Sequence, residues 1–183
     1  MQRSIWSSTY IVGGLAAGCL SAMVMIQHSA DQMLSGSGAW SINNPGLRTR
    51  ADVYARAHDL LAGRLPPPPS QIIEAIASHD DEGEPLSARC TYRLTATAAM
   101  PVWWSVSAIA GQTADAALQA SAHSGSALAA ADGSITITAS SLPVPGNWLK
   151  LPPGPHLSLV YWAVPDSRAA AQPSFTVTRE GCS

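Results

Sequence analysis

The sequence is poor in charge. Only 12% of its 183 residues are Asp, Glu, Lys or Arg, about half the ~25% of an average globular protein. The net charge is −2, and Lys150 is the only lysine. So few cations cannot neutralise a phosphate backbone, which disfavours nucleic acid as a partner. The hydrophobic content of 46% also argues against a disordered chain, which needs low hydrophobicity and high net charge.

Patterns typical of catalysis and metal binding are missing as well. None of the five histidines lies near another histidine or a cysteine at the spacing of a metal site. Neither a G-x-S-x-G turn, a phosphate-binding loop nor a G-x-G-x-x-G fingerprint occurs. The sequence therefore predicts no metal and no cofactor, and it gives no reason to expect an enzyme.

Residues 10–26 contain no charged side chain and predict a transmembrane helix. At ~1.5 Å per residue this stretch is about 25 Å long, and residues 7–9 extend it toward the ~30 Å of a bilayer core. Arg3 precedes the stretch, and no basic side chain follows it until Arg48. This charge bias predicts an inner-membrane protein with a cytoplasmic tail over 1–9 and a periplasmic C-terminal domain.

Two alternatives for this segment stay open. One is a cleaved signal peptide, although His28 is bulky where a cleavage site favours a small residue. The other is a lipoprotein signal that ends at Cys19. Small residues recur every fourth position at Gly14, Gly18 and Ala22. This spacing predicts a helix-packing face, although glycine and alanine are also common in membrane helices generally.

The segment after the apolar stretch changes character twice. Residues 27–48 are rich in serine and glycine and predict a tether with one aromatic side chain, Trp40. Thr49 can then cap a short amphipathic helix that ends at Gly63. We take residues 49–183 as one periplasmic β-rich domain.

From residue 70 onward the hydrophobic period changes to two, which is typical of β-strands. We expect six or seven short strands with polar outer faces, and hence a mainly β fold of the antiparallel β-sandwich or jelly-roll type. The Ala-rich stretch 107–132 predicts neither a helix nor a loop clearly. The expected strands cover residues 71–78, 88–95, 102–108, 134–138, 157–162 and 175–178.

The weak candidates for ligand binding lie in two loops and one strand. Asp80 and Asp81 could bind a cation, although Gly83 after them favours a solvated hairpin tip. Trp103 must point away from the side that Trp104 faces if both lie in a strand. It could pack in the core, line a groove for sugar or lipid, or contact a partner.

Asn147 beside Trp148 is the best single candidate for a ligand contact. Cys90 and Cys182, the two cysteines beyond the apolar stretch, could form a disulfide in an oxidising periplasm. Alternatively, Cys90 is only a buried thiol.

Several short motifs together resemble the bacterial family called domain of unknown function 1214. The resemblance covers about residues 38–165, and its order and spacing are specific although each motif is short. The motifs are residues 50–57, the acidic hairpin 80–86 leading into 90–92, residues 103–106, residues 132–137 and residues 147–149.

The resemblance implies a β-rich domain without implying an activity or a cofactor. Longer relatives carry it behind a second domain, domain of unknown function 1254, so the partner could be a separate chain that carries this companion. This chain departs from the family pattern after Val106 and after Leu149, which leaves any ligand site in those loops open.

Two functions are compatible with these observations. The first is a non-catalytic subunit of an envelope complex, anchored in the inner membrane and bound to a protein partner or to other copies of itself. The second is a protein or enzyme that binds carbohydrate or lipid at the membrane surface.

Overall fold

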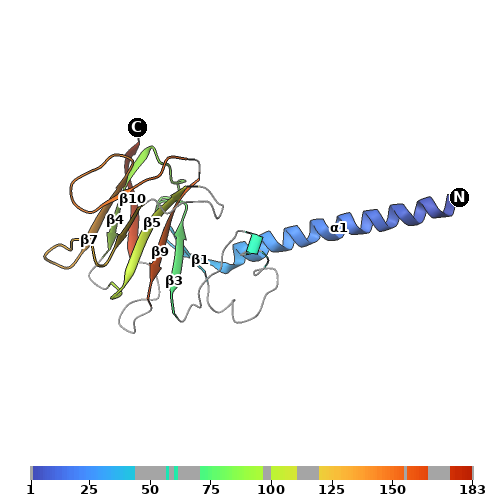
Figure 1. The fold of residues 1–183 in the computed structure, drawn as a ribbon, viewed down its shortest axis with the longest axis horizontal. Helices are drawn as coiled ribbons and strands as arrows, with labels where there is room; N and C mark the ends of the chain where they lie inside the picture. The colour runs from blue at the N-terminus through green and yellow to red at the C-terminus, as the bar shows by residue number, and fades with distance from the viewer. Residues whose placement is uncertain are drawn as a thin grey trace.

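A long helix leads into two β-sheets in a computed structural model of the protein (Figure 1). The structure describes residues 2–43, 57, 60–61, 71–96, 100–110, 120–154, 156–164 and 174–182. The elements are α1 (Gln2–Met33), β1 (Leu34–Ser37), β2 (Trp40–Asn43), β3 (Ile73–Ala77), β4 (Cys90–Ala96), β5 (Trp104–Ala110), β6 (Ala120–His123), β7 (Ile135–Ser140), β8 (Trp148–Lys150), β9 (Leu157–Ala163) and β10 (Phe175–Cys182).

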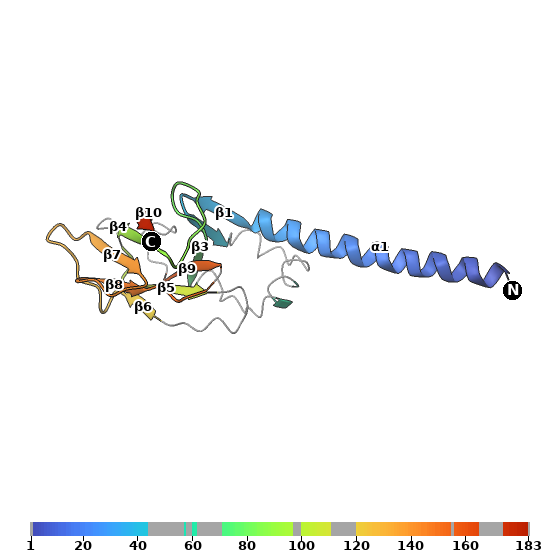
Figure 2. The ribbon, with the colours of Figure 1, turned by 90° about the horizontal axis from the view of Figure 1, so that it is seen from above.

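The strands form one sheet of six and one of four (Figure 2). The order is β1-β2-β3-β9-β5-β6 in the larger sheet and β10-β4-β7-β8 in the smaller one. Every neighbouring pair is antiparallel except β7 and β8, which are parallel. The mainly β fold expected from the period-two pattern is confirmed, and each of the six expected strands overlaps an observed one.

The core lies between the inner faces of the two sheets. In β4 the residues Cys90, Tyr92 and Leu94 are buried while Arg93 is exposed, which is the alternation of a strand with one solvated face. Four aromatic rings meet edge to face at the centre. The ring centroids are 5.9 Å apart for Trp40 and Tyr161, 6.1 Å for Tyr161 and Phe175, and 5.2 Å for Phe175 and Trp104.

The hydroxyl of Tyr161 is buried among these rings and has no hydrogen-bond partner in the part of the chain that the structure describes. Burial raises the pKa of Tyr161 to about 12 because the phenolate would lose its hydration.

Residues 34–43, expected to belong to a tether, form the β1–β2 hairpin at the edge of the larger sheet. Gly38 lies in the tight turn between the two strands, where it adopts a φ of 61°. Trp40 and Ile42 then alternate into the core, and the indole Nε1 of Trp40 donates a hydrogen bond to the Phe175 carbonyl at 2.5 Å. The serine- and glycine-rich composition concealed this alternation.

The helix α1 extends away from the β-domain, and its N-terminal end is the most distant point of the molecule (Figure 1). Within the described residues, no helix has both the length and the apolar character that crossing a membrane requires. The transmembrane helix predicted over 10–26 is therefore not supported by the structure, although these residues are helical.

Parts of two expected segments lie outside the described residues. Of the amphipathic helix expected over 49–62, the structure describes residues 57 and 60–61, which are helical. In the Ala-rich stretch 107–132, residues 111–119 are not described, and the remainder contains the end of β5, all of β6 and a turn.

Candidate functional site

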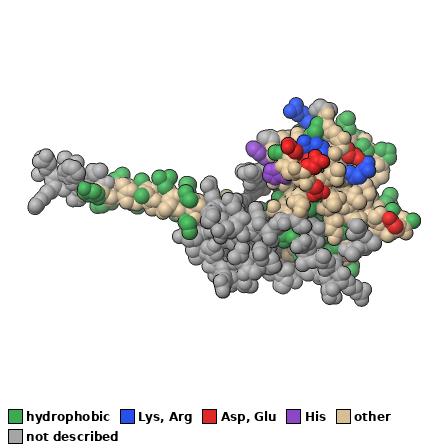
Figure 3. All heavy atoms as spheres, turned by 180° about the vertical axis from the view of Figure 1, so that it is seen from behind, with side chains coloured by type: hydrophobic (Ala, Val, Ile, Leu, Met, Phe, Trp, Pro, Cys, Tyr) green, Lys and Arg blue, Asp and Glu red, His purple; other side chains and the backbone are tan. Residues whose placement is uncertain are grey.

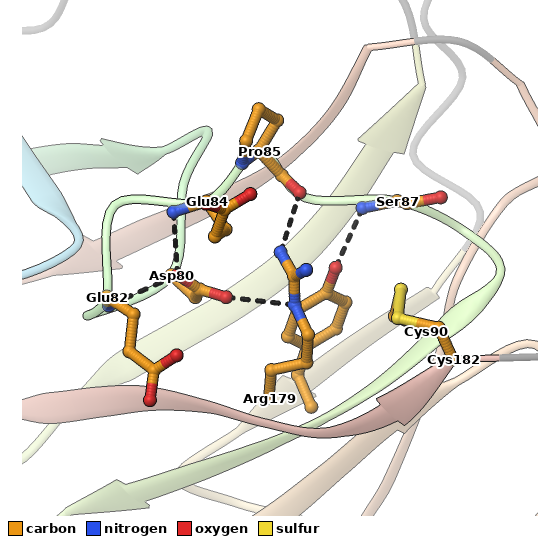
Figure 4. Close-up of polar contacts among 9 residues, drawn as sticks. Asp80, Glu82, Glu84, Pro85, Ser87, Cys90, Arg179 and Cys182 are labelled. Carbon is orange, nitrogen blue, oxygen red and sulfur yellow. Dashed lines mark hydrogen bonds and ion pairs between the residues drawn. A yellow bond between two sulfur atoms is a disulfide. The ribbon is translucent and has the colours of Figure 1, made fainter.

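The side chain of Asp80 is buried rather than solvated. It is 1% exposed, and its Oδ2 lies 3.0 Å from Nε of Arg179 in an ion pair. Its Oδ1 accepts hydrogen bonds from the backbone N–H groups of Glu82 at 3.1 Å and Glu84 at 2.9 Å (Figure 4). The expectation of a solvated hairpin tip is therefore corrected at Asp80, because an arginine distant in sequence neutralises it.

Arg179 joins this acidic hairpin to β10. Its Nη2 donates a hydrogen bond to the Pro85 carbonyl at 3.0 Å, and its guanidinium lies 5.8 Å from the ring centroid of Tyr92. The Tyr92 hydroxyl in turn accepts the Ser87 N–H at 2.8 Å. The contacts of Arg179 therefore hold both arms of the hairpin.

Asp81 connects the hairpin to two further segments. Its Oδ1 accepts the Ala39 N–H at 2.9 Å in the β1–β2 turn, and its Oδ2 accepts the Val177 N–H at 2.7 Å in β10. Its own N–H donates to the Val177 carbonyl at 3.0 Å. Asp81 thus occupies the free edge of β10 much as a neighbouring strand would.

We call Asp80, Asp81 and Arg179 the acidic clasp. Each oxygen of the two carboxylates contacts either Arg179 or a backbone N–H group, which indicates a structural role for both side chains. Over the described residues, no group of three or more His, Cys, Asp or Glu side chains is placed to hold a metal ion.

The predicted disulfide between Cys90 and Cys182 is present beside the acidic clasp (Figure 4). The two cysteines are directly paired in the register of β4 and β10 and lie 92 residues apart in the sequence. In the chain-entropy model, closing so long a loop stabilises the fold by about 4 kcal/mol. The disulfide fixes the end of β10, from which Arg179 projects.

The tryptophans divide between the core and the surface. Trp104 is buried, whereas Trp103 is 41% exposed and Trp162 is 38% exposed. Val102 and Val164 are also exposed, and the Val164 N–H donates to the Trp103 carbonyl at 3.1 Å. We call these four residues the apolar patch, and it lies at one end of strands β5 and β9.

Asn147 is occupied by bonds within the protein. Its Nδ2 donates to the carbonyls of Leu128 at 2.7 Å and Thr136 at 2.9 Å, and its Oδ1 accepts the Leu128 N–H at 2.7 Å. The neighbouring indole of Trp148 donates to the Ser140 carbonyl at 3.2 Å and to the Ser140 hydroxyl at 3.1 Å. Asn147 therefore positions loops instead of offering free polar atoms to a ligand.

A shallow groove of about 340 Å³ lies beside Asn147. Its polar lining includes Thr136 and Thr138, which the sequence analysis did not single out although their alternation in β7 places them on the outer face of the smaller sheet. The groove brings Asn147 close to these threonines but does not include Trp148, Trp103 or the acidic clasp. Its lining is Leu128, Ala129, Ala130, Ser134, Thr136, Thr138, Pro145, Gly146 and Asn147.

These features define a disulfide-bonded β-domain whose groove is lined by uncharged residues. The chain belongs to the family described as "Protein of unknown function (DUF1214)", whose model matches residues 71–163. The match contains the acidic hairpin, Asn147 and strands β3 to β9, whereas the β1–β2 hairpin and β10 lie outside it. The resemblance drawn from the sequence motifs is thus confirmed. No curated protein matches the chain.

The solved structures that are similar to this chain include two bacterial proteins. One is the VPA0106 protein from Vibrio parahaemolyticus, with 19% identity, a TM-score of 0.53, and coverage of 68% of this chain and 34% of that one. The other is an uncharacterized protein from Burkholderia cenocepacia, with 22% identity, a TM-score of 0.48, and coverage of 60% and 29%. The match therefore spans about a third of the length of each solved structure.

Proposed function

We propose that this chain is a non-catalytic interaction subunit that α1 holds at the inner membrane, with the β-domain in the periplasm. The observation that carries the proposal is the surface of α1 over residues 10–26. This stretch has no charged residue, and its apolar side chains are exposed along the helix (Figure 3).

The apolar surface surrounds the helix. Leu15, Leu20 and Met25 are spaced five residues apart, so successive side chains are rotated by roughly 140° about the axis. All three are exposed, Leu15 to 65% and Leu20 to 66%. Apolar side chains exposed on several sides of a helix favour an apolar environment, and contact with a bilayer supplies one.

The periplasmic side of the proposal is supported by the disulfide between Cys90 and Cys182, since such bonds persist in oxidising compartments. The interaction role is supported by the apolar patch. Exposed aromatic and aliphatic side chains that lie together are typical of contact with another protein. The occupied carboxylates of the acidic clasp favour a non-catalytic role.

A membrane wash tests the anchor. We expect the full chain to remain with membranes after carbonate extraction, and the variant Leu15→Arg with Leu20→Arg to be released, because each arginine at the centre of a helix costs about 2.5–3.5 kcal/mol on insertion. The matched control is Leu60→Arg with Leu61→Arg, since these leucines are similarly exposed. Release of the unchanged chain, or equal retention of both variants, would overturn the membrane anchor.

Cross-linking in intact membranes tests the interaction role. The full chain should form a cross-linked species larger than the monomer, and Trp103→Ala with Trp162→Ala should weaken it. Leu142→Ala is the control, because Leu142 is an exposed leucine outside the apolar patch. A chain that remains monomeric under mild solubilisation and gives no cross-linked species would rule out the interaction role.

A further inference from the structure

We propose that the groove beside Asn147 binds an uncharged, hydroxyl-rich ligand, and specifically a segment of neutral carbohydrate. This inference goes beyond the interaction role and depends on different residues. It is carried by three observations: the groove is built rigidly, its polar lining consists of hydroxyls and one amide, and the same chemistry continues across the sheet.

Hydrogen bonds fix the two walls of the groove. The side chain of Asn147 connects its own loop to Leu128 in the opposite wall and to Thr136 in the floor. The Thr138 N–H donates to the Asn147 carbonyl at 2.8 Å, and the Ala130 N–H donates to the Ser134 carbonyl at 2.8 Å. A site that is already ordered loses less conformational entropy on binding.

The lining selects the class of ligand. The side chains that line the groove include no titratable group, so a phosphate or carboxylate ligand would lose hydration without gaining an opposite charge. Thr136 and Thr138 each carry a hydroxyl, which provides one donor and two acceptor lone pairs. Neither hydroxyl bonds to another described residue, and so both can exchange hydrogen bonds with the hydroxyls of a sugar.

The outer face of the smaller sheet extends this chemistry beyond the groove. In the register of β10, β4 and β7, Thr176, Thr95 and Thr136 form one row across the sheet. The next row contains Thr178, Arg93 and Thr138, and Arg93 is paired with Glu180. Residues that are directly opposite each other share a face. The first row therefore extends the threonine surface beyond the groove, with the Thr176 hydroxyl donating to the Thr95 carbonyl at 3.2 Å, whereas the Arg93–Glu180 ion pair interrupts the second row.

An aromatic side chain that could pack on a sugar ring lies next to the threonines. Trp148 pairs with Thr138 in the parallel register of β7 and β8, is partly exposed, and has its indole N–H fixed by Ser140. Its ring therefore lies on the same face as the threonines. Apolar faces of sugar rings can pack on such a ring while their hydroxyls bond to threonine.

The experiment follows the indole N–H signals of the full chain by NMR in a sugar-free detergent. The neutral probes are cellohexaose, maltohexaose and N-acetylchitohexaose, and the charged probes are inorganic phosphate and an oligogalacturonate. We expect at least one neutral probe to shift the Trp148 signal, assigned by Trp148→Phe, and the charged probes to leave it unchanged.

Isosteric variants locate the site. Thr136→Val with Thr138→Val should weaken binding about tenfold, because two hydrogen bonds to the ligand are lost. Thr91→Val, in β4 but outside the groove lining and outside both rows, should change the affinity less than twofold. The proposal is overturned if no neutral probe shifts Trp148, if the charged probes bind equally well, if the double variant binds like the unchanged chain, or if Thr91→Val weakens binding as much.

Discussion

The acidic clasp and the groove differ in how many of their polar side-chain groups are already bonded within the protein. In the clasp, every carboxylate oxygen of Asp80 and Asp81 is paired with an arginine or accepts a hydrogen bond from a backbone N–H group. In the groove, Asn147 is equally saturated, but the neighbouring hydroxyls of Thr136 and Thr138 are not bonded to described residues. A side chain's remaining bonding capacity, rather than its charge, therefore distinguishes the structural positions of the clasp from the positions that we propose to bind a ligand.

The physical reason is desolvation. A charge that leaves water must regain its interactions inside the protein, and this applies to Asp80, whose side chain is 1% exposed. Asp81 is exposed and Asn147 is half-buried, so their hydrogen bonds serve to connect segments of the chain. Threonine on the outer face of a sheet stays hydrated and incurs no such cost. A ligand can therefore compete with water for the threonines, whereas at Asp80 it would have to displace Arg179 and two backbone N–H groups.

The largest expected effect is at Asp80. We predict that Asp80→Ala lowers the free energy of unfolding by about 3 kcal/mol, because it leaves the partly buried Arg179 uncompensated and two backbone N–H groups without their acceptor. Urea denaturation of the full chain measures it. Glu84→Gln in the same exposed hairpin should change it by less than about 0.5 kcal/mol. Equal values for the two variants would show that Asp80 is dispensable to the fold.

Asn147 gives the matching prediction at the groove. Asn147→Ala should lower the free energy of unfolding by about 2 kcal/mol, less than Asp80→Ala, since water can replace some of the three lost hydrogen bonds. Asn147→Asp should cost at least as much, because a carboxylate would face the carbonyls of Leu128 and Thr136. If both variants unfold like the unchanged protein, Asn147 does not hold the walls and is free to contact a ligand.

The strands could be predicted from the sequence wherever neighbouring residues carried the pattern. Residues 88–95 alternate cleanly because one face of β4 is buried, and this pattern alone predicted a strand there. The core position of Trp40 was missed because the surrounding serines and glycines resemble a linker, although only Gly38 among them lies in the turn. The disulfide was predictable because only two cysteines lie beyond residue 26.

The candidate site was less accessible because its contacts are distant in sequence. Asp81 bonds to Val177, 96 residues away, and Asn147 bonds to Leu128, 19 residues away. The residues next to Asp81 in the sequence show only an acidic run that is typical of a turn. Those next to Asn147 show only a polar residue beside a tryptophan. Which of these polar groups remain available depends on partners that only the folded chain brings together.

The smallest expected effect is a difference between two glycines of the clasp region. Both Gly38, with φ 61°, and Gly83, with φ 85°, adopt the left-handed conformation, so alanine at either should cost about 1 kcal/mol of backbone strain. A Cβ at Gly83 would meet open space, whereas a Cβ at Gly38 would lie 2.8 Å from Oδ1 of Asp81. Gly38→Ala must therefore displace the carboxylate that bonds Ala39 and Val177.

We predict that Gly38→Ala lowers the free energy of unfolding by about 1 kcal/mol more than Gly83→Ala does. This difference is roughly the net contribution of one hydrogen bond. In an Asp81→Ala background the excess should vanish, because the atom that the new methyl group strikes is gone. A double-mutant cycle measured by urea denaturation isolates this coupling. An excess that persists without the Asp81 carboxylate would place the cost in the turn itself, and Asp81 would then no longer be the link between the β1–β2 hairpin and β10.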